Sequence, residues 1–136
     1  MEEIPAYLFV YGTLLNDQNE FGAYLKHNCR FFKNGRFKGK LYDIGKYPGA
    51  VFEPAIGTFV HGAVFIINRP TEILKVLDDY EGFGTGYPQP NEYLRELVDI
   101  ETGGEYIKCW VYLYNWPVNN AAQIPLGNYV VFKGPK

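Results

Sequence analysis

The sequence has 136 residues, of which 47% are apolar and 18% aromatic, and its formal net charge is −2. This length and composition predict a single domain, residues 1–136, around one hydrophobic core. The weak negative charge disfavours nucleic-acid binding, and we interpret the densest cationic stretch, residues 33–40, as the solvated face of a hairpin.

The chain opens with a predicted strand and a predicted helix. Residues 7–12, YLFVYG, form an apolar and aromatic run that ends in glycine, which is typical of a buried strand entering a tight turn. Residues 16–27 begin with capping residues and then place apolar side chains at helical spacing. They predict a short helix, which Gly22 weakens.

A strand-rich region follows, over residues 29–67. Asn34-Gly35 is a typical hairpin turn signal, and residues 46–53 predict a loop followed by a strand. Residues 58–67 predict a long strand with Gly62 inside it, which indicates a bulge or a barrel corner.

The second half of the chain adds one helix and more strands. Residues 70–81 predict a helix, and residues 93–114 predict two strands joined by a turn at Gly103-Gly104. A last short strand is expected at residues 129–132. Many strands with few helices indicate an α+β fold, and aromatic-rich strands in so short a chain favour a small closed or nearly closed β-barrel.

The helix over residues 70–81 ends in an unusual carboxylate. Glu81 follows Leu77 by four positions and Leu74 by seven, which places it with the apolar face of the helix. Asp78 and Asp79 belong to the opposite face, where we expect them to be solvated. Burial and the negative end of the helix dipole would both raise the pKa of Glu81, which suits a group that accepts and returns a proton. The alternative is a frayed last turn with Glu81 in solvent.

The turn at Gly12 is a second candidate. A strand that ends in a sharp turn leaves backbone N–H groups without partners, and such groups can point together at an oxygen atom, as in an oxyanion hole. The alternative is a plain strand-to-helix turn that uses Gly12 for its backbone freedom.

Several residue types are scarce or absent. The sequence contains no serine, which excludes a serine nucleophile, and its two histidines lack metal-ligand spacing, so we expect no metal site. Cys29 and Cys109 are expected to be thiols of a cytoplasmic protein, and the alternative is a single disulfide between distant strands. The acidic N-terminus and the lack of a long apolar run disfavour secretion and membrane insertion.

Four blocks of the sequence together resemble the γ-glutamylcyclotransferase-like family, which includes γ-glutamylamine cyclotransferases and plant AIG2-like proteins. The blocks are FVYGTLL (9–15), GKLYDIGKYPGAV (39–51), LDDYEGF (77–83), and YLRELVDI (93–100) followed by CWVYLY (109–114). The resemblance implies a small mixed β-barrel with a few short helices and a cavity at one end.

The resemblance also implies an activity and its residues. Members of this family cleave γ-glutamyl amides by cyclisation, which releases 5-oxoproline and a free amine and requires no metal or cofactor. Carried over to this chain, the resemblance implies that Glu81 is the catalytic acid and base. It further implies that Tyr11, Gly12, Thr13 and Leu14 form the loop that binds a small γ-glutamyl substrate.

Other residues have more than one interpretation. Tyr47 and Tyr93 are either walls of the substrate pocket or core aromatics. Arg95 either pairs with a carboxylate of the substrate or, as we expect, braces the fold. A non-enzymatic relative could use the same cavity to bind a small metabolite or a partner, and an aromatic barrel could stack single-stranded nucleic acid. The sequence makes no prediction of an oligomeric state.

Overall fold

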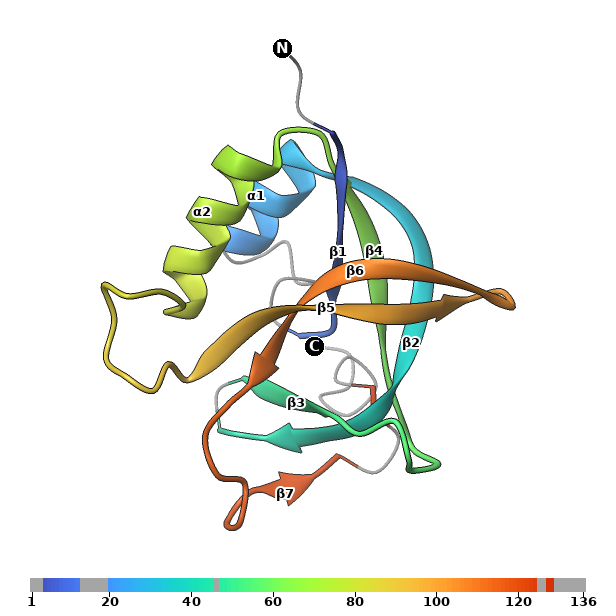
Figure 1. Cartoon of the computed structure of the whole chain (residues 1–136), viewed down its shortest axis with the longest axis vertical. Helices are drawn as coiled ribbons and strands as arrows, with labels where there is room; N and C mark the ends of the chain where they lie inside the picture. The colour runs from blue at the N-terminus through green and yellow to red at the C-terminus, as the bar shows by residue number, and fades with distance from the viewer. Residues whose placement is uncertain (1–3, 13–19, 46, 125–126, 129–136) are drawn as a thin grey trace.

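The computed structural model describes residues 4–12, 20–45, 47–124 and 127–128. In these described residues, seven strands and two helices follow one another (Figure 1). They are β1 (Ala6–Val10), α1 (Glu20–Asn28), β2 (Arg30–Asp43), β3 (Pro48–Phe52), β4 (Phe59–Ile67), α2 (Pro70–Glu81), β5 (Tyr93–Thr102), β6 (Glu105–Tyr114) and β7 (Ala122–Gln123).

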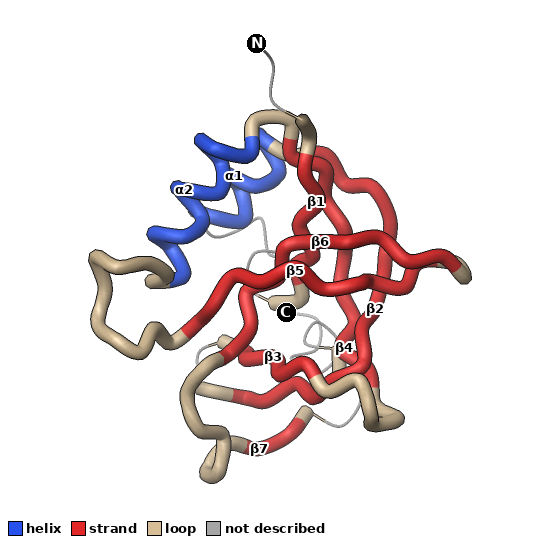
Figure 2. Tube along the Cα trace, viewed as in Figure 1, coloured by secondary structure: helices blue, strands red, loops and turns tan. Residues whose placement is uncertain are grey.

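Five of the strands close into a barrel. Their order is β2-β4-β1-β6-β5, and the pairing of Arg36 in β2 with Glu101 in β5 closes the ring. Neighbouring strands are antiparallel, except that β1 runs parallel to β6. The prediction of an α+β fold built on a small mixed β-barrel is therefore confirmed. Figure 2 shows both helices together on one side, and β3 and β7 beyond the other end of the barrel.

The core has two parts because side chains of a strand alternate between its faces. Phe9 and Tyr11 point into the barrel, where they pack with residues of the surrounding strands. Leu8 and Val10 point the other way, toward α1 and α2. The end of β1 therefore brings Tyr11 to the barrel interior and Gly12 to its edge.

The predicted hairpin turn at Asn34-Gly35 is wrong, because β2 runs unbroken through both residues. Gly35 lies opposite Gly62 of β4, and the register shift in this strand pair falls between residues 31 and 33. A Cβ atom at Gly62 would lie 2.2 Å from the carbonyl oxygen of Val10. These glycines allow neighbouring strands to approach closely, and neither marks a turn or a bulge.

Other predicted elements agree with the structure. Helix α2 has the predicted bounds, and Gly103-Gly104 forms the turn between β5 and β6 with φ values of 56° and 89°. Helix α1 overlaps the predicted helix over residues 16–27, of which 16–19 lie outside the described residues. The predicted strand at residues 129–132 also lies outside them, and β7 was not predicted.

Within the described segments, no helix combines the length and the apolar character needed to cross a membrane. Cys29 and Cys109 are free thiols, as expected from the sequence.

Candidate active site

Helix α2 carries Glu81 on its last turn. Pro70 begins the helix, and Gly82 ends it in the left-handed conformation, at φ 73° and ψ 32°. The N–H of Phe83 then donates to the carbonyl oxygen of Asp78 at 2.9 Å, which closes the last turn. Glu81 is therefore held in an ordered helix end, and the alternative of a frayed turn is wrong.

The side chain of Glu81 lies between two hollows. The first, which we call the Gly12 cavity, has a volume of about 40 Å³ and is lined by Phe9, Val10, Tyr11, Gly12, Pro48, Glu81, Tyr93 and Tyr112. The second, which we call the Glu92 hollow, has a volume of about 170 Å³ and is lined by Tyr47, Tyr80, Glu81, Glu92 and Tyr93. Glu81 and Tyr93 belong to both, so a molecule in either hollow would lie beside Glu81.

The environment of Glu81 raises its pKa from 4.5 to about 8. Burial is the main cause, because it disfavours the charged form, and the negative charges of Glu92 and Asp78 act in the same direction. The residue keeps some accessible surface, whereas its carboxyl group is largely enclosed. Among the described residues no cation pairs with it. At neutral pH this carboxyl group can both give and take a proton.

Two hydrogen bonds fix the side chain of Tyr11, which lines the Gly12 cavity. Its buried hydroxyl donates to the carbonyl oxygen of Tyr112 and accepts from the N–H of Ala50 at 3.2 Å. These bonds tie the end of β1 to β6 and β3. Burial, reinforced by the negative charge of Glu81, raises the pKa of the Tyr11 phenol far above its usual range. The hydroxyl therefore stays protonated and positions the strand end.

Gly12 lines the cavity through its backbone. It does not have a positive φ, so the interpretation that the turn needs glycine for backbone freedom is wrong. A Cβ atom there would instead lie 2.6 Å from Cγ of Pro48. Glycine is required because the chain passes tightly over Pro48. The other two predicted loop residues, Thr13 and Leu14, lie outside the described residues.

Tyr47 and Tyr93 both stand at the cavity walls. The hydroxyl of Tyr93 donates to the carbonyl oxygen of Pro48 at 2.7 Å, and that of Tyr47 donates to Glu92 at 2.9 Å. Their rings pack edge to face with centroids 6.0 Å apart. The structure thus places both residues beside Glu81, Tyr93 in both hollows and Tyr47 in the Glu92 hollow.

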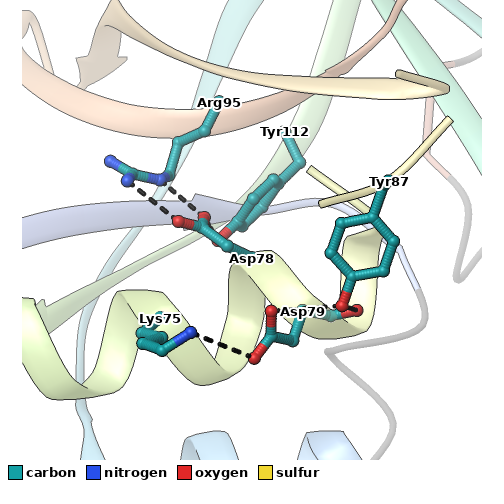
Figure 3. A network of polar contacts seen from close by, with 6 residues as sticks. All are labelled: Lys75, Asp78, Asp79, Tyr87, Arg95 and Tyr112. Atoms are coloured by element: carbon teal, nitrogen blue, oxygen red, sulfur yellow. Dashed lines mark hydrogen bonds and ion pairs between the residues drawn. The ribbon is translucent and has the colours of Figure 1, made fainter. Parts of the chain in front are cut away.

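Asp78 is not solvated, contrary to the expectation from the sequence. It accepts two hydrogen bonds from Arg95, at 2.7 and 3.0 Å, and a third from the hydroxyl of Tyr112 at 2.7 Å (Figure 3). The expectation that Arg95 braces the fold is confirmed, because it joins β5 to α2 and also lies 4.5 Å from the ring centroid of Trp110. Asp79 is exposed, as expected.

Glu92 was not predicted from the sequence. This residue immediately precedes β5 and lies in the wall of the Glu92 hollow, where its charge contributes to the raised pKa of Glu81. The one available signal was its place next to Tyr93, a residue already assigned to the pocket. Among the described residues, no three His, Cys, Asp or Glu side chains lie together so that they could hold a metal ion.

Comparison with known proteins agrees with this fold. Residues 8–131 match the family described as γ-glutamyl cyclotransferase, AIG2-like, and the chain belongs to this family. It is 33% identical over 130 residues to the γ-glutamylcyclotransferase family protein YtfP of Citrobacter rodentium, with 90% of this chain and 94% of the relative covered. The corresponding YtfP of Escherichia coli K12 is 32% identical, with 90% and 95% covered.

Solved structures have the same architecture. The solution structure of YtfP from Escherichia coli gives a TM-score of 0.65 at 29% identity and covers 94% of this chain and 99% of its own. A crystal structure of an AIG2-like protein from Mus musculus gives a TM-score of 0.64 at 22% identity, with 98% of each chain covered. At that identity the likeness shows the fold alone.

Proposed function

We propose that this protein cleaves γ-glutamyl amides by intramolecular cyclisation and releases 5-oxoproline and a free amine. The observation that carries the proposal is the carboxyl group of Glu81, which is buried without a cationic partner among the described residues and has a pKa of about 8 between two hollows. A buried, unpaired acid costs stability, so its presence favours a chemical role. Membership of the cyclotransferase family supports the reaction class.

In the proposed reaction, Glu81 carries protons from the attacking nitrogen to the leaving nitrogen. Its carboxylate takes a proton from the α-ammonium group of the substrate, and the freed amine attacks the γ-carbonyl carbon. A C–N bond forms to close the five-membered ring, and the carbonyl oxygen becomes an oxyanion. Glu81 gives its proton to the leaving nitrogen, the oxyanion returns to a carbonyl, and the bond to the leaving nitrogen breaks. The ring nitrogen, which became positively charged on attack, loses its second proton to the ionised Glu81, which passes it to the departing amine.

The nucleophile belongs to the substrate, so the protein needs none of its own. Well-oriented intramolecular attack can contribute about 7–11 kcal/mol, provided that the pocket holds the substrate folded. Cys29 and Cys109 line neither hollow, and burial raises their thiol pKa values to about 11 and about 12. Both are therefore poor nucleophiles at neutral pH.

The loop after β1 has the proposed role of holding the substrate. We assign the oxyanion to backbone N–H groups of the loop formed by Tyr11, Gly12, Thr13 and Leu14. Gly12 supports this because it lines the cavity beside Glu81. Tyr93 and Tyr47 would flank the substrate on the side of the Glu92 hollow.

The proposal is tested by product detection. The purified protein is incubated with a panel of γ-glutamyl amides, and 5-oxoproline and the released amine are measured by mass spectrometry. We expect equal amounts of the two products from at least one amide. Release of glutamate instead of 5-oxoproline would show simple hydrolysis and contradict cyclisation. Folded protein that turns over no amide of the panel would favour a binding role for the cavity.

The pH dependence of kcat/KM should report the pKa of Glu81. Because the base must be ionised, we expect kcat/KM to rise with pH and to inflect near 8, whereas an ordinary glutamate would inflect near 4.5. The α-amino group of the substrate titrates at about 8 as well. The variant Glu92→Gln distinguishes the titration of Glu81 from that of the substrate. It removes a negative charge beside Glu81, so only the inflection that Glu81 causes should move to lower pH. An unmoved profile would contradict the assignment.

A further inference from the structure

The Glu92 hollow has the chemical character of a site for a cation. It is lined by the rings of three tyrosines, Tyr47, Tyr80 and Tyr93, and by the carboxyl groups of Glu81 and Glu92. No lysine or arginine lines it, as far as the described residues show. Aromatic faces and carboxylates attract an ammonium group, and the attraction grows where water is excluded.

Glu92 is held in a fixed position. The hydroxyl of Tyr47 donates to its Oε2 atom at 2.9 Å, and the N–H of Asn115 donates to its main-chain oxygen at 2.7 Å. The ring of Tyr47 packs in turn against Tyr93. Within the described part of the chain, the Oε1 atom of Glu92 has no hydrogen-bond partner and Glu92 has no ion pair. One carboxylate oxygen is therefore positioned and available to a ligand.

A second carboxyl group, that of Glu81, also favours cation binding at the Glu92 hollow. Glu81 is buried, has no cationic partner among the described residues and reaches the same hollow from the opposite element, α2. Two carboxyl groups at one small hollow repel each other, and this repulsion adds to the effect of burial in raising the pKa of Glu81. A bound cation would relieve that repulsion.

We propose that the Glu92 hollow binds a positively charged ammonium group on the leaving amine, so that the protein prefers γ-glutamyl amides of diamines to those of neutral monoamines. This inference rests on the proposed function. The α-ammonium group of the substrate is a poorer occupant, because it must become neutral before it attacks. Two neighbouring carboxylates would hold its proton and slow that step.

The test compares two amides of equal length. One is the γ-glutamyl amide of an unbranched four-carbon diamine, and the other that of an unbranched five-carbon monoamine. We expect kcat/KM to be about tenfold higher for the diamine amide, as for a charge-assisted hydrogen bond, and Glu92→Gln to bring the ratio close to one. The ratio cancels any change in the pKa of Glu81, because that change affects both substrates.

A matched control is Glu96→Gln. Glu96 is exposed on β5, four residues from Glu92, and its side chain forms no ion pair with a described residue and does not line the hollow. This variant therefore removes the same charge away from the hollow. It should keep the parental ratio. A parental ratio near one would overturn the proposal. Equal slowing of both amides by Glu92→Gln would also overturn it, because that result would place the α-ammonium group of the substrate in the hollow.

A binding measurement separates this inference from the proposed function. The free four-carbon diamine is titrated into the parent and into Glu92→Gln, and binding is followed by NMR. We expect shifts at Tyr47 and Tyr93 in the parent that are lost in the variant. Diamine binding without turnover of any amide would reject the cyclotransferase and keep the cation site. Turnover without diamine binding or preference would reject the cation site and keep the cyclotransferase.

Discussion

Glu81→Gln is expected to lower the rate of 5-oxoproline release by a factor of about 10³, within the range typical of acid–base catalysis. Glutamine has nearly the same shape as glutamic acid, but its amide neither takes a proton from the attacking amine nor returns one to the leaving nitrogen. The measurement is the initial rate at pH 8 with the best substrate of the panel. Substrate binding should persist, because the hollows keep their lining.

The same substitution should stabilise the fold at high pH. The folded state binds the Glu81 proton up to pH about 8, whereas the unfolded chain loses it near 4.5. In that interval the folded state binds more protons, so the free energy of unfolding of the parent falls as pH rises. Glutamine does not ionise, so the free energy of unfolding of the variant does not fall for this reason as pH rises. Denaturant unfolding should show the variant more stable by a few kcal/mol at pH 9, and the difference should shrink toward pH 5.

Asp79→Asn is the control for both effects. Asp79 lies on the same helix, two residues from Glu81, but its side chain is 53% exposed and faces solvent. Its replacement should change neither the rate nor the pH dependence of stability by much. If Glu81→Gln kept most of the parental rate in a folded protein, Glu81 would not be the proton carrier.

The part of the site that could be predicted from the sequence depends on local spacing. The bounds of α2 follow from Pro70 and Gly82, and the inward position of Glu81 follows from its distance to Leu77 and Leu74 along one helix face. The pairing of β5 with β6, in which Tyr93 lies opposite Tyr114, could be predicted in the same way, because the turn at Gly103-Gly104 sets its register.

The part that could not be predicted depends on contacts between distant segments. Asn34-Gly35 carries the signature of a turn, yet Gly35 lies within β2. There a Cβ atom would lie 2.6 Å from the side chain of Ile100 on β5, the strand that pairs with β2 where the barrel closes. Asp78 has the spacing of a solvated helix residue, and only the return of β5 brings Arg95 to it. Such pairs follow from the closure of the barrel, which no window of the sequence contains.

These distant contacts also decide which charges reach Glu81. Asp78 and Glu92 are both negative neighbours of Glu81, but only Asp78 has a described cationic partner, Arg95. The ion pair with Arg95 therefore offsets the negative charge of Asp78, whereas no described cation offsets the charge of Glu92 beside the hollow. Arg95 acts on the site through Asp78 and the end of α2, so we regard it as a positioning residue.

Arg95→Met is expected to destabilise the fold by about 3 kcal/mol, as measured by denaturant unfolding at neutral pH. The side chains of Arg95 and Asp78 are only 17% and 18% exposed, and their ion pair is bidentate. Methionine fills much of the same space but leaves the Asp78 carboxylate with Tyr112 as its one described hydrogen-bond donor. The cost is mainly that of a poorly solvated charge that has lost its partner.

The same helix provides a control ion pair (Figure 3). Lys75 and Asp79 are 3.7 Å apart with side chains 79% and 53% exposed, so Lys75→Met should change stability by about 0.5 kcal/mol or less. Adding Asp78→Asn to Arg95→Met removes the stranded charge and should restore much of the loss. Arg95→Met alone should also move the kcat/KM inflection to higher pH, because Asp78 is then no longer offset beside Glu81. Equal losses in the two single variants would mean that the Arg95–Asp78 pair is no more than a surface contact.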